Sequence, residues 1–433
     1  MDGQTRGVVH ATKQARFAQR LKRRHAAEAR FRFYGIAAIG IAICFLIALF
    51  VSIIGQGYSA FTQSVIKLEV AFDQTVIDPA GDRNPDTLLA ANYEQLARDA
   101  LRKQVAVEST ADKRKSNGLL SRGAPFLLRD MVVSDPSIIG TTQTVWVPAH
   151  GDVDALIKGH IDRNLPEAQR RLDDQQTAWV DQLVASGTLS RQFNWTLFTS
   201  GASSNPEQAG IGVAIVGSAY MMLIVLLLAL PIGVLAAVYL EEFARKNRWT
   251  DLIEVNINNL AAVPSIVFGL LGLAVFINFF GLPRSAPLVG GLVLTLLTLP
   301  TIIITTRASI RAVPPSIKQA ALGLGASRMQ AMFHHTLPLA APGILTGTIL
   351  GLAHALGETA PLLMIGMVAF VVGYPATPLD PATALPVQVY MWSGAAERGF
   401  VERTSAGIIV LLVFLIIMNS AAVWLRRKFE RRW

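Results

Sequence analysis

The stretch Arg311-Ala-Val-Pro-Pro-Ser-Ile-Lys-Gln-Ala-Ala-Leu-Gly-Leu-Gly-Ala-Ser-Arg328 decides how this chain of 433 residues is organised. Its paired prolines, Pro314 and Pro315, end an apolar segment and predict the start of a short helix. Gly325 permits a turn, and Ser327 is suited to cap a second short helix. A rigid helix-turn-helix of this kind suits docking into a groove of a partner protein.

Apolar segments flank this stretch on both sides and recur along the chain. Hydrophobic residues make up 52% of the sequence and charged residues only 16%, against about 25% in a typical soluble protein. A transmembrane helix needs about 20 predominantly apolar residues. The sequence therefore predicts six transmembrane helices, at 34–54, 211–240, 260–280, 288–306, 339–372 and 405–425.

Basic residues predict the orientation of these helices. The arm 1–33 holds nine Lys and Arg residues, the tail 426–433 is also basic, and segment 307–336 has four Lys or Arg residues and no acid. Because all three abut apolar segments, positive-inside flanks explain them better than nucleic-acid-binding tails. We therefore expect both termini and the 307–337 loop to be cytoplasmic.

Segment 56–207 is then extracytoplasmic, and with 15 basic and 19 acidic residues it is slightly acidic. Alternating β-branched residues and amphipathic periodicity predict a small α+β domain. Its expected strands are 64–72 and 142–147, its expected helices are 86–105 and 173–185, and 113–117 is an expected polar loop.

Enzyme chemistry is not indicated. No G-x-x-x-x-G-K-[ST], G-x-S-x-G or H-E-x-x-H motif occurs, and the single cysteine, Cys44, allows neither an intrachain disulfide nor a cysteine-based metal site. We therefore expect no catalytic residue, no metal and no cofactor bound by this chain. Any ATPase that powers it must be another chain.

The 311–338 region resembles the coupling loop of ABC importer permeases, whose pattern is E-A-A, three residues, Gly, nine residues, Ile, one residue and Leu-Pro. The chain matches that pattern at Ala320, Ala321, Gly325, Leu337 and Pro338. It departs at Gln319, where the family has Glu, and at His335, where Ile is common. The resemblance implies that the loop contacts a partner ATPase, with the two alanines offering a small-residue face.

A second resemblance concerns the substrate. The stretch Leu-Ala-His-Ala-Leu-Gly-Glu-Thr-Ala-Pro-Leu-Leu at 352–363 resembles a signature of the permease A subunits of phosphate-specific ABC importers, and the stretches at 239–242 and 299–301 are similar to that family. The likeness covers about 210–425. It implies a type I ABC importer permease fold, a second permease, an ATPase homodimer that uses ATP and Mg, a periplasmic phosphate-binding protein and phosphate as substrate.

Polar residues in the apolar segments are the candidates for the substrate path. Glu358 is predicted to lie inside a long apolar helix, where a carboxylate is usually functional or paired. His354 is one turn earlier and shares its face, and Thr359 follows in the same signature. We expect Glu358 to pair with a basic group. Arg307 is either an exit residue or a positive-inside anchor.

Threonines recur at helical spacing in the fourth apolar segment: Thr295, Thr298, Thr301 and Thr305. They either line a wet path for an oxyanion or donate hydrogen bonds back to their own helix.

The predicted architecture is an all-α membrane protein of six transmembrane helices, with an extracytoplasmic α+β insertion. The segments are a basic arm (1–33), a first transmembrane helix (34–55), the insertion (56–207), a permease core (208–425) and a basic tail (426–433). The expected function is phosphate import through the inner membrane. The alternatives are a permease for phosphonate, sulfate or molybdate, and a membrane-anchored sensor.

Overall fold

The computed structural model describes residues 3–107 and 109–429, which form two units, Met1–Gly55 and Gln56–Trp433. The first unit consists of most of helix α1 (Gly3–Gly57). The part of it that is long and apolar enough to cross a membrane begins at Arg24. The predicted first span, 34–54, lies inside that part.

An α+β insertion opens the second unit. Its sheet has three antiparallel strands in the order β2-β1-β3, formed by β1 (Thr62–Ala71), β2 (Thr142–Pro148) and β3 (Leu189–Phe193). The register pairs Val65 with Pro148 and Thr62 with Phe193. The strands predicted at 64–72 and 142–147 are confirmed, whereas the edge strand β3 was not predicted.

Eight α-helices accompany the sheet within the described part of the insertion: α2 (Gln74–Ile77), α3 (Pro85–Ala90), α4 (Tyr93–Arg102), α5 (Thr110–Asn117), α6 (Ala124–Ser134), α7 (Gly151–Ile157), α8 (Asp174–Ala185) and α9 (Thr196–Thr199). The helix predicted at 173–185 is confirmed. The helix predicted at 86–105 is two helices, because Asn92 accepts a hydrogen bond from the main-chain N–H of Gln95 and starts a new one. The prediction of a loop at 113–117 was wrong. Ser109 and Asp112 form a capping box that begins α5, and this helix continues to Asn117.

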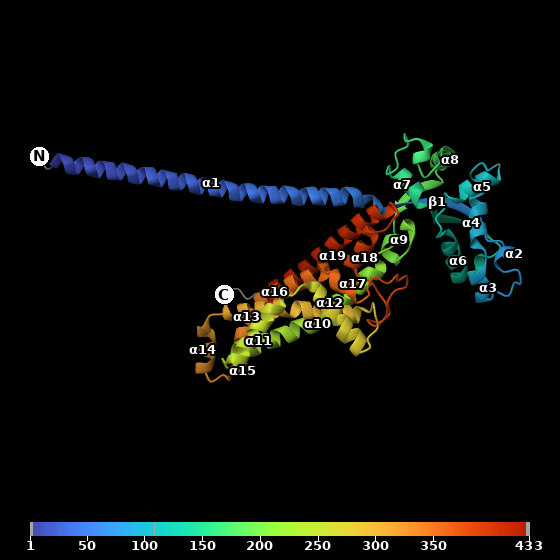
Figure 1. The fold of residues 1–433 in the computed structure, drawn as a ribbon. Coiled ribbons are helices and arrows are strands. Elements are labelled where there is room, and N and C mark those ends of the chain that lie inside the picture. The colour runs from blue at the N-terminus through green and yellow to red at the C-terminus, as the bar shows by residue number, and fades with distance from the viewer. Residues whose placement is uncertain (1–2, 108, 430–433) are drawn as a thin grey trace. The chain divides into compact units, whose positions relative to one another are not determined.

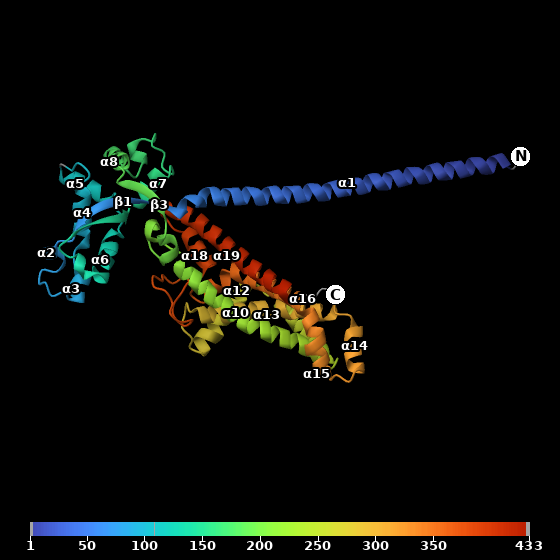
Figure 2. The ribbon, with the colours of Figure 1, turned by 180° about the vertical axis from the view of Figure 1, so that it is seen from behind.

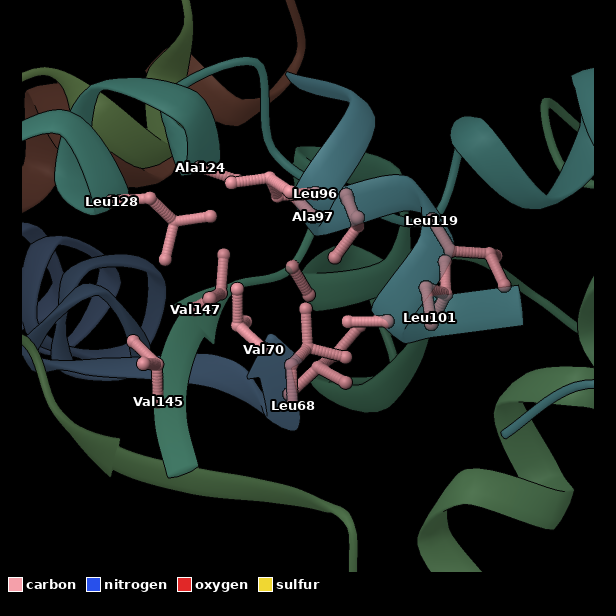
Figure 3. Packing of buried hydrophobic residues seen from close by; sticks show 14 of the residues in the cluster. Leu68, Val70, Leu96, Ala97, Leu101, Leu119, Ala124, Leu128, Val145 and Val147 are labelled. Carbon is pink, nitrogen blue, oxygen red and sulfur yellow. The ribbon is translucent and has the colours of Figure 1, made fainter. Parts of the chain in front are cut away.

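The core of the insertion lies between the sheet and the helices. Leu68 and Val70 of β1 and their neighbours on β2 face α4 and α6 (Figure 3). Leu101 and Leu128 close the core from the helices, and neither is more than 1% exposed. This burial of apolar side chains on one face gives the insertion a core of its own.

The membrane part follows as α10 (Gly212–Val238), α11 (Arg248–Leu260), α12 (Ser265–Gly272), α13 (Pro287–Arg311), α14 (Pro315–Gly323), α15 (Arg328–Gln330), α16 (Leu337–Gly357), α17 (Ala360–Met364), α18 (Leu385–Ser393) and α19 (Gly399–Phe429). Helix α10 packs on α13, α13 on α16, and α16 on α19 (Figures 1 and 2). Gly347 of α16 makes the second of these contacts close, because a Cβ there would lie 2.0 Å from Thr305 Oγ1.

Five helices of the described chain are long and apolar enough to cross a membrane, and a sixth span results if one bent helix pair counts as one. That pair, Arg248–Leu260 and Ser265–Phe279, is bent by 103° and replaces the straight span predicted at 260–280. Pro264 lies in the break, where its ring cannot continue a helix. The span predicted at 339–372 also ends early, at Gly357.

Candidate functional site

The break after α16 brings His354 and Glu358 together. The two side chains are one helical turn apart, and His354 Nε2 lies 2.9 Å from Glu358 Oε1. The imidazole is 63% exposed and the carboxylate is 16% exposed. A half-buried acid therefore holds an exposed imidazole at the surface of the membrane part.

Glu358 was predicted to lie inside a long apolar helix, and this prediction was wrong. It is the C-terminal cap of α16, with extended backbone (φ −74°, ψ 127°), and Thr359 precedes the short helix α17. Pro361 explains the break, because it lies in the first turn of α17 and has no main-chain N–H to donate the hydrogen bond that would continue α16.

The threonine face of α13 is turned into the protein. Thr295 donates to Gly291 O at 2.7 Å, and Thr298 donates to Leu294 O at 2.9 Å. Both are buried, while Thr301 is half-buried. Thr305 donates back to Thr301 O at 2.8 Å. The observed hydroxyls thus follow the second of the two expectations, in which they bond to their own helix.

Arg307 lies at the other end of α13 and is held by two carboxylates. Its Nε is 3.3 Å from Glu241 Oε2, and its Nη2 is 2.5 Å from Glu254 Oε1. Arg311 reaches the same Glu241 at 2.8 Å. The ion pairs of Arg307 tie the end of α13 to the residues after α10 and to α11.

The 311–338 loop folds as its sequence predicts. Helix α14 begins at Pro315 and ends in a Schellman turn, in which Ala326 N–H donates to Ala321 O and Gly325 N–H donates to Leu322 O. Gly325 has the left-handed backbone that this turn requires (φ +91°). Ser327 caps α15 through a capping box with Gln330.

The two alanines of the loop have different surroundings. Ala320 and the neighbouring Gln319 are exposed, but Ala321 is buried against the chain itself, so the small-residue face is only half available. Leu337 and Pro338 are half-buried where α16 begins. Leu324 was not predicted as a contact residue, yet its side chain is 91% exposed between two glycines. An apolar side chain presented in this way is a natural contact for a partner.

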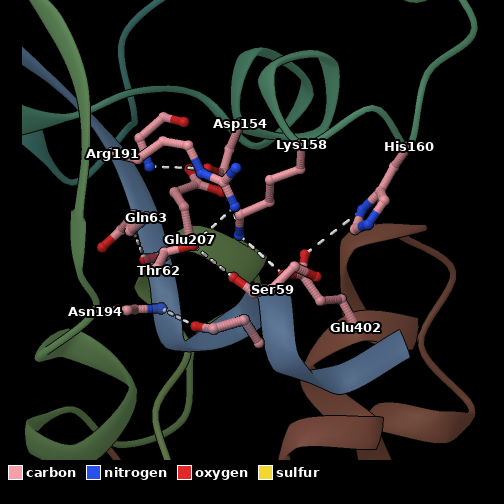
Figure 4. Close-up of polar contacts among 12 residues, drawn as sticks. Ser59, Thr62, Gln63, Asp154, Lys158, His160, Arg191, Asn194, Glu207 and Glu402 are labelled. Carbon is pink, nitrogen blue, oxygen red and sulfur yellow. Dashed lines mark hydrogen bonds and ion pairs between the residues drawn. The ribbon is translucent and has the colours of Figure 1, made fainter. Parts of the chain in front are cut away.

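A salt bridge ties the insertion to the last span, α19. Lys158 Nζ lies 2.6 Å from Asp154 Oδ2 and 2.9 Å from Glu402 Oε1, and its side chain is only 1% exposed (Figure 4). Within the insertion, the buried carboxylate of Glu207 accepts a hydrogen bond from Ser121 Oγ at 3.0 Å. Because Lys158 and Glu402 are 244 residues apart, no local pattern could have found this contact.

A second ion pair closes the same junction at its surface. Arg171 Nη1 lies 2.7 Å from Glu397 Oε2, and both side chains are about half exposed. The hydrogen bond from Arg171 lowers the pKa of Glu397 below its ordinary value. A cavity of about 690 Å³ lies between the two pairs, and its lining carries charges of both signs.

Among residues 3–107 and 109–429, no group of three or more His, Cys, Asp or Glu side chains is arranged to hold a metal ion. The site is thus built from ion pairs, a broken helix and a projecting loop. Packed apolar spans interrupted at polar residues define the class of the protein, a multi-pass membrane protein.

Comparison with known proteins identifies the family. Residues 229–433 match the model described as binding-protein-dependent transport system inner membrane component, and residues 18–167 match a domain of unknown function, DUF3333. A probable ABC transporter permease protein, YqgI of Bacillus subtilis, is 32% identical over 54% of this chain and 83% of that relative. The chain therefore belongs to the family of ABC transporter permeases, the inner-membrane components of binding-protein-dependent transport systems.

Other relatives have a more specific name. The phosphate transport system permease protein PstA of Xylella fastidiosa (strain Temecula1) is 30% identical over 54% of this chain and 80% of its own. PstA 1 of Mycobacterium tuberculosis (strain H37Rv) is 30% identical over 59% of this chain and 82% of that relative. Among solved structures, a chain of the inward-facing MetNI methionine ABC transporter has a TM-score of 0.41 and 17% identity, over 51% of this chain and 95% of that one.

Proposed function

We propose that this permease is a subunit of an ATP-driven importer of inorganic phosphate. The observation that carries the proposal is its identity of about 30% to phosphate transport system permeases over four fifths of their length. The 352–363 stretch supports the same assignment, because its Gly-Glu-Thr-Ala-Pro segment forms the helix break that positions His354 and Glu358.

The proposed importer needs three kinds of partner. A second permease completes the path, an ATPase homodimer binds the 311–338 loops and uses ATP and Mg, and a binding protein delivers phosphate on the extracytoplasmic side. Both termini then lie in the cytoplasm, and this chain binds no cofactor. Exposed Leu324 at the tip of the loop supports contact with the ATPase.

In the proposed path, His354 is the residue of this chain that meets phosphate. Its exposed imidazole lies beside Glu358, and a ring N–H of the imidazole can donate a hydrogen bond to an oxyanion. Glu358 is a positioning residue, because it is more buried and holds the imidazole from behind. Alternating access then exposes the break to each side of the membrane in turn.

Phosphate uptake by proteoliposomes tests the proposal, with both permeases, the ATPase and the binding protein present. Glu358→Gln keeps the size of the side chain but removes the charge beside His354. A hydrogen bond to a charged group contributes about 1.5–3 kcal/mol, so we expect uptake to fall about tenfold or more. Glu397→Gln is the matched control, because that carboxylate lies in an exposed pair and should leave uptake unchanged.

The two parts of the proposal fail separately. An assembled parent complex without ATP-dependent phosphate uptake would refute the substrate, and uptake of sulfate, molybdate or phosphonate would then identify another oxyanion. Normal phosphate uptake by Glu358→Gln would keep the substrate and reject the His354–Glu358 pair as its site.

A further inference from the structure

Four aromatic residues gather at the base of the insertion, where β3 leads into α9 (Thr196–Thr199). The rings of Phe193 and Trp195 meet edge to face at 4.8 Å between centroids. Phe198 stacks on Phe193 at 6.0 Å and on Phe61 at 6.1 Å. These four side chains are called the aromatic cluster.

The outer half of the aromatic cluster is open. Trp195 is 69% exposed and Phe193 is 50% exposed. Asn194, which lies between them in the sequence, is buried, and its side-chain amide donates to Ala60 O at 2.8 Å (Figure 4). The same side chain accepts a hydrogen bond from Leu197 N–H. The hydrogen bonds of Asn194 therefore hold the turn between β3 and α9 in place, while the rings of Phe193 and Trp195 stay exposed to solvent. Exposed apolar rings that lie together are typical of an interaction surface.

The inner half of the aromatic cluster reaches the membrane part. Phe61 and Phe198 pack against a buried group that includes Ala214, in the first turn of α10, and Ala406, in the second turn of α19. Tyr374 OH also donates to Phe198 O at 3.3 Å. The aromatic cluster thus lies level with the ends of two apolar spans, at the depth where a bilayer changes from hydrocarbon to headgroups.

A basic residue, Arg191, lies beside the aromatic cluster, as expected for a surface at the level of the lipid headgroups. Arg191 and Phe193 are two residues apart on β3 and so point to the same side of the strand. Arg191 is exposed, and its Nη2 donates to Thr62 Oγ1 at 3.1 Å. Tyr58, which follows directly after α1, is also exposed. Tryptophan, tyrosine and a nearby cation are typical of residues that sit in the interface of a membrane.

We propose that the aromatic cluster is a lipid-binding surface, whose partner is the interfacial layer of the bilayer on the side of the insertion. Trp195 and Phe193 insert among the glycerol and upper acyl regions, and Arg191 meets lipid phosphates. The surface holds the insertion against the membrane and fixes its height above the ends of α10 and α19. This proposal does not depend on which solute the permease carries.

Quenching by brominated lipids tests the proposal with the full chain in vesicles of phosphatidylcholine and phosphatidylglycerol, brominated near the headgroup end of the acyl chains. The contribution of one tryptophan is the difference between the parent and a Trp→Phe variant. Trp146 is the matched control, because it is also exposed in the insertion but lies on β2 opposite Lys67, about 16 Å along β1 from the aromatic cluster. We expect strong loss of the Trp195 emission and little loss of the Trp146 emission.

Two results would overturn the proposal. Equal quenching of Trp195 and Trp146 would show no selective contact with lipid. Quenching of Trp195 that is present in the isolated chain but lost on assembly with the second permease and the ATPase would assign the aromatic cluster to a protein partner. Conservative Trp→Phe changes keep the rings apolar, so loss of folding should not confuse either result.

Discussion

Removal of the carboxylate charge at Glu402 should loosen the junction between the insertion and α19. Lys158 is 1% exposed and is shared by Asp154 and Glu402, whose side chains are 10% and 11% exposed. Glu402→Gln leaves an amide oxygen for Lys158, and Asp154 still compensates its charge. The variant therefore loses one charge-assisted hydrogen bond, about 1.5–3 kcal/mol, rather than the 3–5 kcal/mol expected for a charge left wholly unpaired.

The exposed pair at the same junction supplies the comparison. Arg171 and Glu397 are about half exposed, and such pairs contribute about 0.2–1 kcal/mol. Thermal unfolding of the full chain in detergent should therefore rank the parent first, Glu397→Gln close behind it and Glu402→Gln clearly lower. Lys158→Met should be lower still, because it leaves two buried carboxylates facing each other. If Glu402→Gln were no less stable than Glu397→Gln, burial of the Lys158 network would not be what stabilises the junction.

Three further outcomes are expected. Leu324→Asp should abolish transport-coupled ATPase stimulation without loss of folding, since the side chain is 91% exposed, and normal stimulation would place the ATPase contact elsewhere. Thr298→Val should leave uptake nearly unchanged, because its buried hydroxyl donates to its own helix; a large loss would restore the pore interpretation. The lowered pKa of Glu397 means that its pair stabilises the fold above the unfolded value of 4.5 and that this contribution is lost as the pH falls through the folded pKa. The unfolding midpoints of the parent and Glu397→Gln should thus differ above pH 4.5 and converge below it, and a constant difference would contradict this origin.

The caps and turns that depend on neighbouring residues could be predicted from the sequence. The turn at Gly325 and the cap at Ser327 were predicted from a few neighbouring residues, and both are confirmed. The break after Gly357 was also encoded locally, by Pro361, but the long apolar run around it suggested one continuous helix. At 113–117, a strongly polar segment was taken for a loop, although the capping box at Ser109 indicated a helix start.

The electrostatic contacts of the site could be predicted only in part. His354 and Glu358 are four residues apart, so their proximity was predictable, although Glu358 is the extended cap of α16 and not part of a shared helix face. Arg307 was seen as a cation at the end of a span, but its partners Glu241 and Glu254 come from two other segments. Sequence spacing cannot report such a contact, because it depends on how α10, α11 and α13 pack.

Two kinds of contact attach the insertion to the membrane part, and they respond differently to salt. The contact through the aromatic cluster and its buried neighbours is apolar, and Lys158 is screened little because water and ions do not reach it. The exposed Arg171–Glu397 pair, in contrast, should weaken in salt. At 0.5 M NaCl, exposed charges more than about 4 Å apart are largely screened from each other. We therefore expect hydrogen exchange to rise at this salt concentration for the main chain near 397, but not for β1 or the start of α19. A rise throughout the junction would instead mean that long-range charge, rather than packing, holds the insertion in place.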